Sequence, residues 1–234
     1  MLNISELTVV YPDKTMAVNK LTLNVKSKES IAIVGANGSG KTTLMLAIAG
    51  VLPIAEGYIQ VDGIMLEKKT VKEIRTRVGL VFQNPDDQLF TASVYDDVAF
   101  GPRNLGLSEK EVEERVKQTL EALGITHLQK KPALKLSGGE KRLAAIASVL
   151  SIQPSILLFD EPTAFLDLKA RRNLIQLLQN LPHTKLIASH DLAFLEKVCS
   201  CAALLNDGTV VAEGETKDLF HNEMHIDDYG FKGI

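Results

Sequence analysis

One eight-residue segment predicts the architecture of the chain, and it reads Gly35-Ala36-Asn37-Gly38-Ser39-Gly40-Lys41-Thr42. It fits the pattern G-x-x-x-x-G-K-S/T, follows a strand-like run at residues 31–34, and opens a helical stretch at residues 41–49. Glycines in such a loop let backbone N–H groups curl around phosphate oxygens, and the N-terminus of the helix adds positive potential. The segment therefore predicts a phosphate-loop nucleotide site between a strand and a helix.

The side chains within this segment have separate predicted tasks. Lys41 is expected to reach the β- and γ-phosphates of a nucleotide, and the Thr42 hydroxyl to ligate Mg²⁺. The other expected nucleotide contacts come from the loop and from the residue after it: Gly35, Asn37, Gly38, Ser39, Gly40 and Thr43. A glycine-rich turn can be merely structural, but here all fixed positions and both flanking elements agree.

A second chemical element is an acidic pair at the end of an apolar run. Residues 156–159 predict a buried strand, and Asp160 and Glu161 follow it directly. Ligands gather at the carboxyl ends of parallel strands, so the pair is expected beside the phosphate loop. We expect Asp160 to hold Mg²⁺ through water and Glu161 to polarise the attacking water. Turns also favour Asp, so the pair gains its meaning from the phosphate loop.

Strand-like runs alternate with amphipathic helical stretches along the chain, which predicts an α/β fold. Residues 2–10 and 21–25 alternate with period two and predict an N-terminal antiparallel β layer. From residue 93 to 153 no convincing strand is present, which predicts a helical subdomain inserted into the core. Other strands are expected at residues 30–34, 57–61, 78–82, 185–188 and 203–205, and other helices at residues 109–123, 138–151, 169–179 and 192–198.

We expect a single domain over residues 1–220 and a short tail at residues 221–234. The tail is rich in Asp and Gly, which predicts a loosely packed terminus. His221, Met224, His225 and Asp227 could be combined into a metal site, but terminal histidines are far more often simply solvated.

The overall composition argues against several classes of protein. Lys plus Arg total 26 and Asp plus Glu total 29, so the net charge is −3, whereas a nucleic-acid binder normally carries a basic surface. The first ten residues lack the layout of a signal peptide, and no apolar run reaches the roughly 18 residues of a spanning helix. Cys199 and Cys201 are too few for a disulfide framework or a zinc site, which favours a reducing cytoplasm.

Resemblance to a known family begins with the segment Leu136-Ser137-Gly138-Gly139-Glu140. It resembles the signature loop of ATP-binding-cassette (ABC) ATPases, and it precedes Asp160 by about twenty residues, as the order of that family requires. Ser137 is an expected helix cap, and the two glycines expose N–H groups. The resemblance implies that Ser137, Gly138 and Gly139 contact the γ-phosphate bound to an opposite subunit. Two chains would then enclose two ATP molecules head to tail. The resemblance also implies a phosphate-loop NTPase fold, with the mixed sheet of an ABC ATPase core.

Four more positions match the same family in order, and the match covers roughly residues 1–220. The resemblance implies that Tyr11 stacks on adenine and that Gln83 senses Mg²⁺ and the attacking water. It also implies that Asp167 links the two sites and that His190 contacts the γ-phosphate. Alone, each residue has an ordinary explanation, such as an exposed tyrosine or a solvated histidine. Together they fit the family pattern.

Two positions depart from that pattern. Phe165 replaces the small residue usual in the loop around Asp167, and Leu143 stands where arginine is common. Neither departure removes a catalytic group. A phenylalanine at this position is expected to pack at the face between the two chains.

Three stretches narrow the resemblance to the ATPases of energy-coupling-factor importers, which take up vitamins or cobalt and nickel: residues 11–13, 81–90 and 96–102. In such importers a transmembrane coupling protein inserts arginine-bearing helix ends beside the glutamine loop, which corresponds here to the segment that begins at Gln83. Asp86, Asp87, Asp96 and Asp97 form an acidic segment at the matching place, which predicts pairing with those arginines. The alternative is a turn with solvated acids.

The resemblance implies a subunit at the cytoplasmic face of the plasma membrane that binds and hydrolyses ATP with Mg²⁺. Its expected partners are a transmembrane coupling subunit, a cargo-binding membrane subunit and a second ATPase chain, identical or related. The near absence of a C-terminal extension favours a homodimer, with cobalt, nickel or biotin as cargo. Two alternatives stay open: a soluble ABC ATPase that acts on nucleic acid or the ribosome, and a regulatory subunit that binds ATP without hydrolysis.

Overall fold

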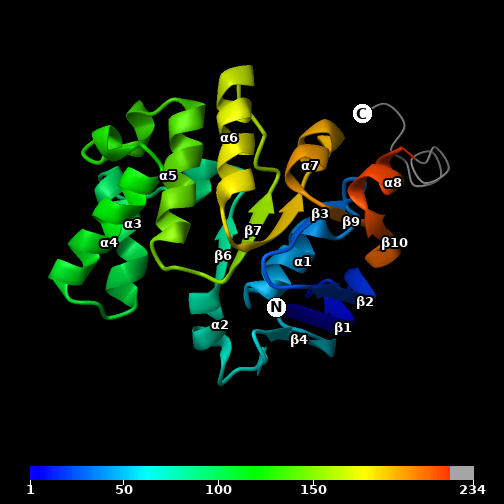
Figure 1. The fold of residues 1–234 in the computed structure, drawn as a ribbon. Coiled ribbons are helices and arrows are strands. Elements are labelled where there is room, and N and C mark those ends of the chain that lie inside the picture. The colour runs from blue at the N-terminus through cyan, green and yellow to red at the C-terminus, as the bar shows by residue number, and fades with distance from the viewer. Residues whose placement is uncertain (222–234) are drawn as a thin grey trace.

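The computed structural model of the chain describes residues 1–221 (Figure 1). Its centre is a six-stranded sheet in the order β10-β9-β3-β8-β7-β6. All neighbouring strands are parallel except the antiparallel pair β9 and β10. The strands of this sheet are β3 (Ser30–Val34), β6 (Val78–Val81), β7 (Ile156–Asp160), β8 (Thr184–Ala188), β9 (Cys201–Asn206) and β10 (Thr209–Glu215).

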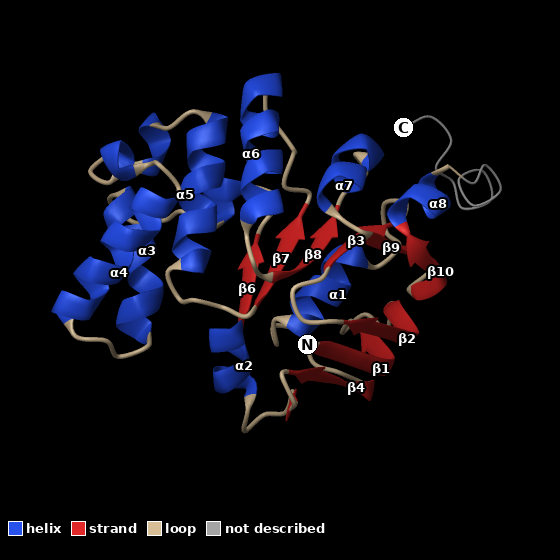
Figure 2. Ribbon diagram, in the orientation of Figure 1, coloured by secondary structure: helices blue, strands red, loops and turns tan. Residues whose placement is uncertain are grey.

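A second, antiparallel sheet in the order β2-β1-β4-β5 lies next to the first one (Figure 2). Its strands are β1 (Leu2–Val10), β2 (Met16–Val25), β4 (Glu56–Val61) and β5 (Ile64–Met65). The strand expected at residues 21–25 begins earlier than predicted, because a register shift interrupts its alternation. Lys20 has a φ of 46° there, so that Val18 and Leu21, three residues apart, are both buried.

Helices cover both faces of the six-stranded sheet. Alternate residues of a strand point to opposite faces, so Ile31 and Ile33 pack with α1 and the antiparallel sheet, whereas Ala32 and Val34 pack on the other side. The helices around this sheet are α1 (Lys41–Ile48), α2 (Val71–Arg77), α6 (Leu168–Asn180), α7 (Leu192–Val198) and α8 (Thr216–Phe220). Within residues 1–221, no helix has the combined length and apolar character that crossing a bilayer requires.

The chain between β6 and β7 is helical, and its helices lie at the side of the six-stranded sheet in Figure 1. It forms a separate cluster of buried side chains. The α-helices are α3 (Val94–Asn104), α4 (Glu109–Ala122) and α5 (Gly138–Leu150), with single 3₁₀ turns η1 (Pro85–Asp87), η2 (Thr126–Leu128) and η3 (Ala133–Lys135). Capping boxes begin two of the helices, with Ser108 and Glu111 at α4 and Ser137 and Glu140 at α5. The division of the chain into a core and an inserted subdomain stays our interpretation.

The expected α/β class, with a mixed sheet and an antiparallel β layer, is confirmed. Five helices and strands were not predicted at their positions, namely α2, β5, α3, β10 and α8, although α3 lies in the stretch that was predicted to be helical. In α2 only Ile74 is buried, and most residues of β10 are half-buried, so neither segment has a repeating apolar pattern. The expected tail and its possible metal ligands lie outside the described residues, apart from His221.

Candidate active site

The phosphate loop connects β3 to α1, between a buried parallel strand and the start of a helix. Its shape depends on glycine at two points. A Cβ atom on Gly35 would collide with the carbonyl oxygen of Leu205, and one on Gly40 would collide with that of Ala17. Gly40 also has a φ of 103°, in a region that favours glycine. The close packing of this loop against two neighbouring backbone segments therefore fixes the position of Lys41, the first residue of α1.

The loop opens onto a hollow of about 580 Å³. This hollow contains most of the residues that sequence reasoning assigned to nucleotide, metal and hydrolysis, although they come from four separate segments. We call it the nucleotide pocket, and its lining residues are Gly35, Ala36, Asn37, Gly38, Gly40, Lys41, Thr42, Thr43, Gln83, Asp160, Glu161 and His190.

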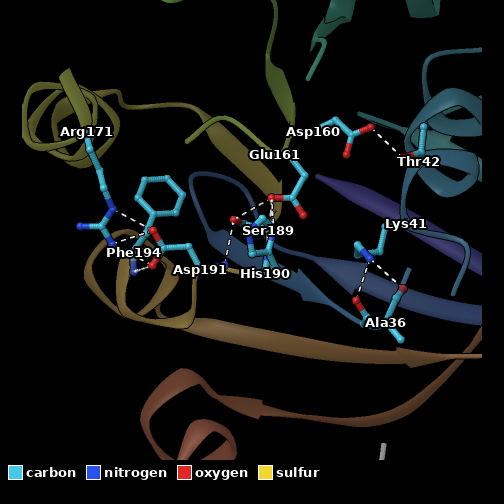
Figure 3. A network of polar contacts seen from close by, with 11 residues as sticks. Ala36, Lys41, Thr42, Asp160, Glu161, Arg171, Ser189, His190, Asp191 and Phe194 are labelled. Carbon is cyan, nitrogen blue, oxygen red and sulfur yellow. Dashed lines mark hydrogen bonds and ion pairs between the residues drawn. The ribbon is translucent and has the colours of Figure 1, made fainter. Parts of the chain in front are cut away.

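The Lys41 ammonium lies inside the loop that precedes it (Figure 3). Its Nζ donates hydrogen bonds to the carbonyl oxygens of Gly35 at 2.7 Å and Ala36 at 2.9 Å. Burial lowers the pKa of Lys41, and the negative charges of Glu161 and Asp160 act in the opposite direction. A buried cation beside these two carboxylates suits a site for a polyanion such as a triphosphate.

Thr42 and Asp160 meet across the pocket, where the Thr42 hydroxyl donates to Oδ2 of Asp160 at 2.8 Å. Burial raises the pKa of Asp160, as does the nearby charge of Glu161. A hydroxyl and a carboxylate are hard oxygen donors of the kind that Mg²⁺ prefers, and these two are close enough to contact one ion directly or through water. The donor set therefore fits the predicted metal.

Glu161 begins the turn after β7, with a φ of 43° and a backbone N–H that donates to the carbonyl oxygen of Ala188 at 2.8 Å. Its Oε2 lies 2.9 Å from Nδ1 of His190. The same oxygen accepts a hydrogen bond from Oγ of Ser189 at 3.1 Å. His190 is largely exposed while the Glu161 side chain is only 12% exposed. The carboxylate is thus held from one side by a buried hydroxyl and faces the pocket beside an accessible imidazole.

The residue after His190 anchors this arrangement to a neighbouring helix. Asp191 caps α7 through the backbone N–H of Phe194 at 2.9 Å. It also accepts two hydrogen bonds from the Arg171 guanidinium of α6, both at 2.8 Å (Figure 3). The backbone N–H of Asp191 donates to Ser189 Oγ at 3.2 Å. Sequence reasoning missed Ser189, Asp191 and Arg171, although an aspartate directly before a helix is a recognisable cap.

Of the residues expected to contact the nucleotide of the same chain, Tyr11 and Ser39 do not line the nucleotide pocket. The hydroxyl of Tyr11 lies 3.0 Å from Oγ1 of Thr43, at the end of β1, and its stacking on adenine stays a prediction. Ser39 is buried, and its Oγ has no hydrogen-bond partner among residues 1–221. A buried hydroxyl without a partner inside a phosphate loop is consistent with a ligand oxygen as its acceptor.

The predicted signature loop begins α5, where the side chain of Ser137 accepts a hydrogen bond from the backbone N–H of Glu140. In return, Oε2 of Glu140 accepts one from the backbone N–H of Ser137 at 2.7 Å, which lowers the pKa of Glu140. Ser137, Gly138 and Gly139 line a second hollow of about 540 Å³, which we call the signature pocket. The nucleotide and signature pockets share no lining residue.

The loop around Asp167 also lines the signature pocket. Asp167 caps α6 through the backbone N–H of Ala170 at 2.7 Å. Phe165 has a φ of 63° and is 84% exposed, so a bulky side chain occupies a strained backbone conformation without being buried within the chain. Leu143 packs against the helical cluster and lines the same pocket.

Gln83 is the second residue after β6, and it lines the nucleotide pocket. Its backbone is held by Arg142, which donates from Nη1 to the carbonyl oxygen of Phe82 and from Nη2 to that of Gln83, both at 2.6 Å. Arg142 is only 1% exposed, and burial lowers its pKa to about 10. Sequence reasoning considered Leu143 and missed this arginine one residue earlier, because nothing local marks a charged helix residue as buried.

The structure corrects one part of the predicted acidic docking segment. Asp97 is 3% exposed, and its Oδ1 accepts hydrogen bonds from the backbone N–H groups of Phe90 at 3.1 Å and Thr91 at 3.0 Å. It shapes the loop before α3 and is not available to a partner. Asp86 is exposed and pairs with Lys141 at 2.6 Å. Sequence reasoning was wrong about Asp97 because an acidic run does not show which of its members point inward.

A phosphate loop at the end of β3, with an acidic pair at the end of β7 and a histidine at the end of β8, defines a phosphate-loop ATPase. The sequence model of the ABC transporter family matches residues 18–164 of this chain. The chain belongs to the ABC transporter family, as an ATPase subunit that binds and hydrolyses ATP.

Relatives of this chain are ATP-binding subunits. A putative ABC transporter ATP-binding protein of Geobacter sulfurreducens is 48% identical, over 95% of this chain and 90% of the relative. The energy-coupling factor transporter ATP-binding protein EcfA of Methanothermobacter thermautotrophicus is 41% identical, over 95% of this chain and 73% of the relative. The solved structure of cbiO1 from Clostridium perfringens, part of the ABC transporter complex cbiONQ, is 37% identical with a TM-score of 0.84. The match covers 99% of this chain and 94% of that chain.

Proposed function

We propose that this chain is the ATP-hydrolysing subunit of an energy-coupling-factor importer, and that the nucleotide pocket is its hydrolytic centre. The observation that carries the hydrolytic assignment is the presence of Glu161 and His190 in one pocket with the phosphate loop and the Thr42–Asp160 pair. Similarity to EcfA and cbiO1 along nearly the whole chain supports the importer type.

In this proposal each side chain of the pocket has one task. Lys41 and the loop N–H groups bind the β- and γ-phosphates, and His190 binds the γ-phosphate from its exposed position. Thr42, Asp160 and Gln83 hold Mg²⁺, which neutralises charge on the phosphate oxygens when it is bound. Glu161 accepts the proton of the attacking water and is kept in orientation by Ser189 and Nδ1 of His190.

Steady-state ATPase measurements on Glu161→Gln test the hydrolytic assignment. The amide keeps the shape of the side chain but cannot act as a base, so kcat is expected to fall at least about a hundredfold. Binding of a fluorescent ATP analogue should persist, because Lys41 and the loop are unchanged. Retained kcat in this variant would refute the role of Glu161. Equal turnover by wild type and variant at a background level would favour the regulatory alternative.

We further propose that two chains enclose two ATP molecules, each between one nucleotide pocket and the signature pocket of the other chain. Ser137 and Gly139 line the signature pocket and not the nucleotide pocket of their own chain, which supports a contact with the nucleotide of a second chain. Exposed N–H groups at the start of α5 suit a phosphate oxygen from outside. Phe165 and Leu168, 84% and 75% exposed, lie in the segment around Asp167 and become covered in such a dimer.

A membrane coupling subunit would bind beside the glutamine loop. Phe90 and Phe100 form an exposed edge-to-face pair there, with ring centroids 5.1 Å apart. Asp87 and Asp96 lie in the same part of the chain, in η1 and α3, and both remain accessible, although Asp96 is also 3.7 Å from the Arg103 guanidinium. Exposed aromatic rings and accessible carboxylates in these segments, which we call the docking patch, suit a helix end that carries arginine.

We assign the chain to the cytoplasmic face of the membrane, attached through these partners, with a cobalt or nickel ion or a vitamin as cargo of the complex. Gentle purification of the tagged chain from membranes of its own cells tests this assignment. Recovery of a multi-spanning coupling protein and a small cargo-binding membrane protein supports it. Recovery of soluble partners alone, with activity stimulated by nucleic acid or ribosomes, would overturn the importer role and leave the ATPase activity standing.

The same purification tests the docking patch. Asp87→Lys reverses one charge beside Phe90 and should reduce recovery of the coupling protein. Glu113→Lys is a matched control, because Glu113 is an exposed acid of α4 outside the patch. Equal losses in both variants would contradict a specific role for the patch.

A further inference from the structure

Arg142 is the most deeply buried charged residue outside the nucleotide pocket, at 1% exposed. Within residues 1–221 no carboxylate lies within ion-pair distance of it, and its Nε has no hydrogen-bond partner. Burial of a guanidinium without a counter-ion is costly, and apolar side chains of similar volume often replace buried ionic groups without loss of stability. Stability alone therefore gives a weak reason for an arginine at this position.

The contacts of Arg142 point to one target. Both terminal nitrogens donate to consecutive carbonyl oxygens, those of Phe82 and Gln83, at 2.6 Å. These carbonyls belong to the two peptide groups on either side of the Cα atom of Gln83, which lines the nucleotide pocket. Within the described residues the Gln83 side chain itself has no hydrogen bond, so its direction depends on how its backbone is held.

Arg142 also ties these peptide groups to the helix that carries the signature loop. It lies on α5, about one turn after Gly138. Two further side chains attach the same loop to α5: Lys141 Nζ pairs with Asp86 at 2.6 Å, and Gln88 Nε2 donates to the carbonyl oxygen of Ala145 at 2.8 Å and to Oγ of Ser148 at 3.0 Å. The glutamine loop and α5 are consequently held together at three points.

We propose that Arg142 is a positioning residue for ATP hydrolysis, which fixes the Gln83 peptide on α5 so that the Gln83 side chain keeps its place in the nucleotide pocket. The inference rests on the proposed role of Gln83 at the metal and the attacking water. It adds that α5, which begins with the signature loop, moves together with Gln83. Arg142 does not line the nucleotide pocket; it lines the signature pocket with only 1% of its surface exposed.

A double-mutant cycle on the full chain tests this inference, with Arg142→Met, Gln83→Ala and the double variant measured for kcat and for KM of ATP. Misplacement of a reacting group by about 1 Å can cost about a hundredfold, so we expect Arg142→Met to lower kcat by about ten- to a hundredfold. The KM for ATP should change less than about twofold. If Arg142 acts through Gln83, adding Arg142→Met to Gln83→Ala should produce no further loss of kcat.

Two more variants keep the test independent of folding defects. Arg142→Lys retains the charge and one donor, and it should recover part of the kcat lost in Arg142→Met. Arg115→Met is the matched control, since Nη1 of Arg115 also donates to a backbone carbonyl, that of Ser151, in the same helical region. Its kcat should equal that of wild type, and melting temperatures of all variants identify any that are merely destabilised.

The outcomes separate the two claims. The positioning role would be overturned if the losses of kcat in the two single variants multiplied in the double variant. It would also be overturned if Arg115→Met lost as much kcat as Arg142→Met. Either result would leave the proposed role of Gln83 standing. Unchanged kcat in Gln83→Ala would remove the proposed role of Gln83 and, with it, the inference about Arg142.

Discussion

Replacing Ser189 by alanine is expected to slow hydrolysis without weakening nucleotide binding. Ser189 is fully buried, and its Oγ donates to Oε2 of Glu161 at 3.1 Å. A hydrogen bond to a charged acceptor contributes about 1.5–3 kcal/mol. Nδ1 of His190 continues to hold the same oxygen at 2.9 Å, which places the loss at the lower end of that range. A loss of about 1.5–2 kcal/mol in transition-state stabilisation lowers kcat by about ten- to thirtyfold.

The assay is steady-state ATP hydrolysis with excess Mg²⁺, together with titration of a fluorescent nucleotide analogue. Ser189 does not line the nucleotide pocket, so KM and analogue affinity should stay within about twofold of wild type. Ser151→Ala is the matched control. Ser151 is also fully buried, and its Oγ donates to the carbonyl oxygen of Ser148 at 3.0 Å at the far end of α5. Its removal should cost stability and leave kcat unchanged.

Two results would refute the reasoning. The first is a Ser189→Ala variant whose kcat lies within about twofold of wild type, because the hydroxyl would then have no part in orienting Glu161. The second is an equal loss of kcat in Ser151→Ala, because a general loss of packing would explain both variants.

Three further predictions concern stability. Asp97→Ala removes the acceptor of two backbone N–H groups and should lower the free energy of unfolding by about 2–3 kcal/mol. This loss corresponds to about 5–10 °C in melting temperature, and Asp97→Asn should lose less. A loss below about 0.5 kcal/mol in urea unfolding would show that these bonds contribute little. Burial raises the pKa of Asp160, so ionisation of this carboxyl destabilises the folded state as pH rises. In the absence of nucleotide, Asp160→Asn should therefore raise the melting temperature more at pH 7 than at pH 4. The opposite trend would contradict the direction of this shift. Burial lowers the pKa of His183 below the ordinary histidine value of 6.5, so the folded state loses stability as pH falls below that value. Between pH 7.5 and 5.5, His183→Gln should therefore lose less stability than wild type. Parallel pH curves for the two proteins would exclude His183 as a source of acid sensitivity.

Much of the fold and the nucleotide pocket could be predicted because the relevant signals are local. The phosphate loop is contiguous in sequence, and the run before Asp160 is apolar at every position, as a strand buried on both faces requires. Gln83 and His190 were expected only from the resemblance to the ABC family, and both line the nucleotide pocket at the edge of the sheet where their strands end.

The residues that support the pocket could not be predicted in the same way. Arg142 and Gln83 are 59 positions apart, and Arg171 and Asp191 are 20 apart, so their contacts exist only after the sheet and helices have packed. Asp97 looked like a surface acid because its neighbours are acidic, whereas its buried carboxylate satisfies backbone groups of a loop that the sequence does not define. Which polar side chains turn inward is a property of tertiary structure.

The separation of the nucleotide and signature pockets has a genetic consequence in the proposed dimer. Each chain contributes half of two different sites, so damage to one chain is shared between sites. A chain without Glu161 paired with a chain without Ser137 forms one site with both defects and one site that is whole. Two inactive alleles can therefore complement each other, whereas a doubly altered copy mixed with wild type impairs both sites at once.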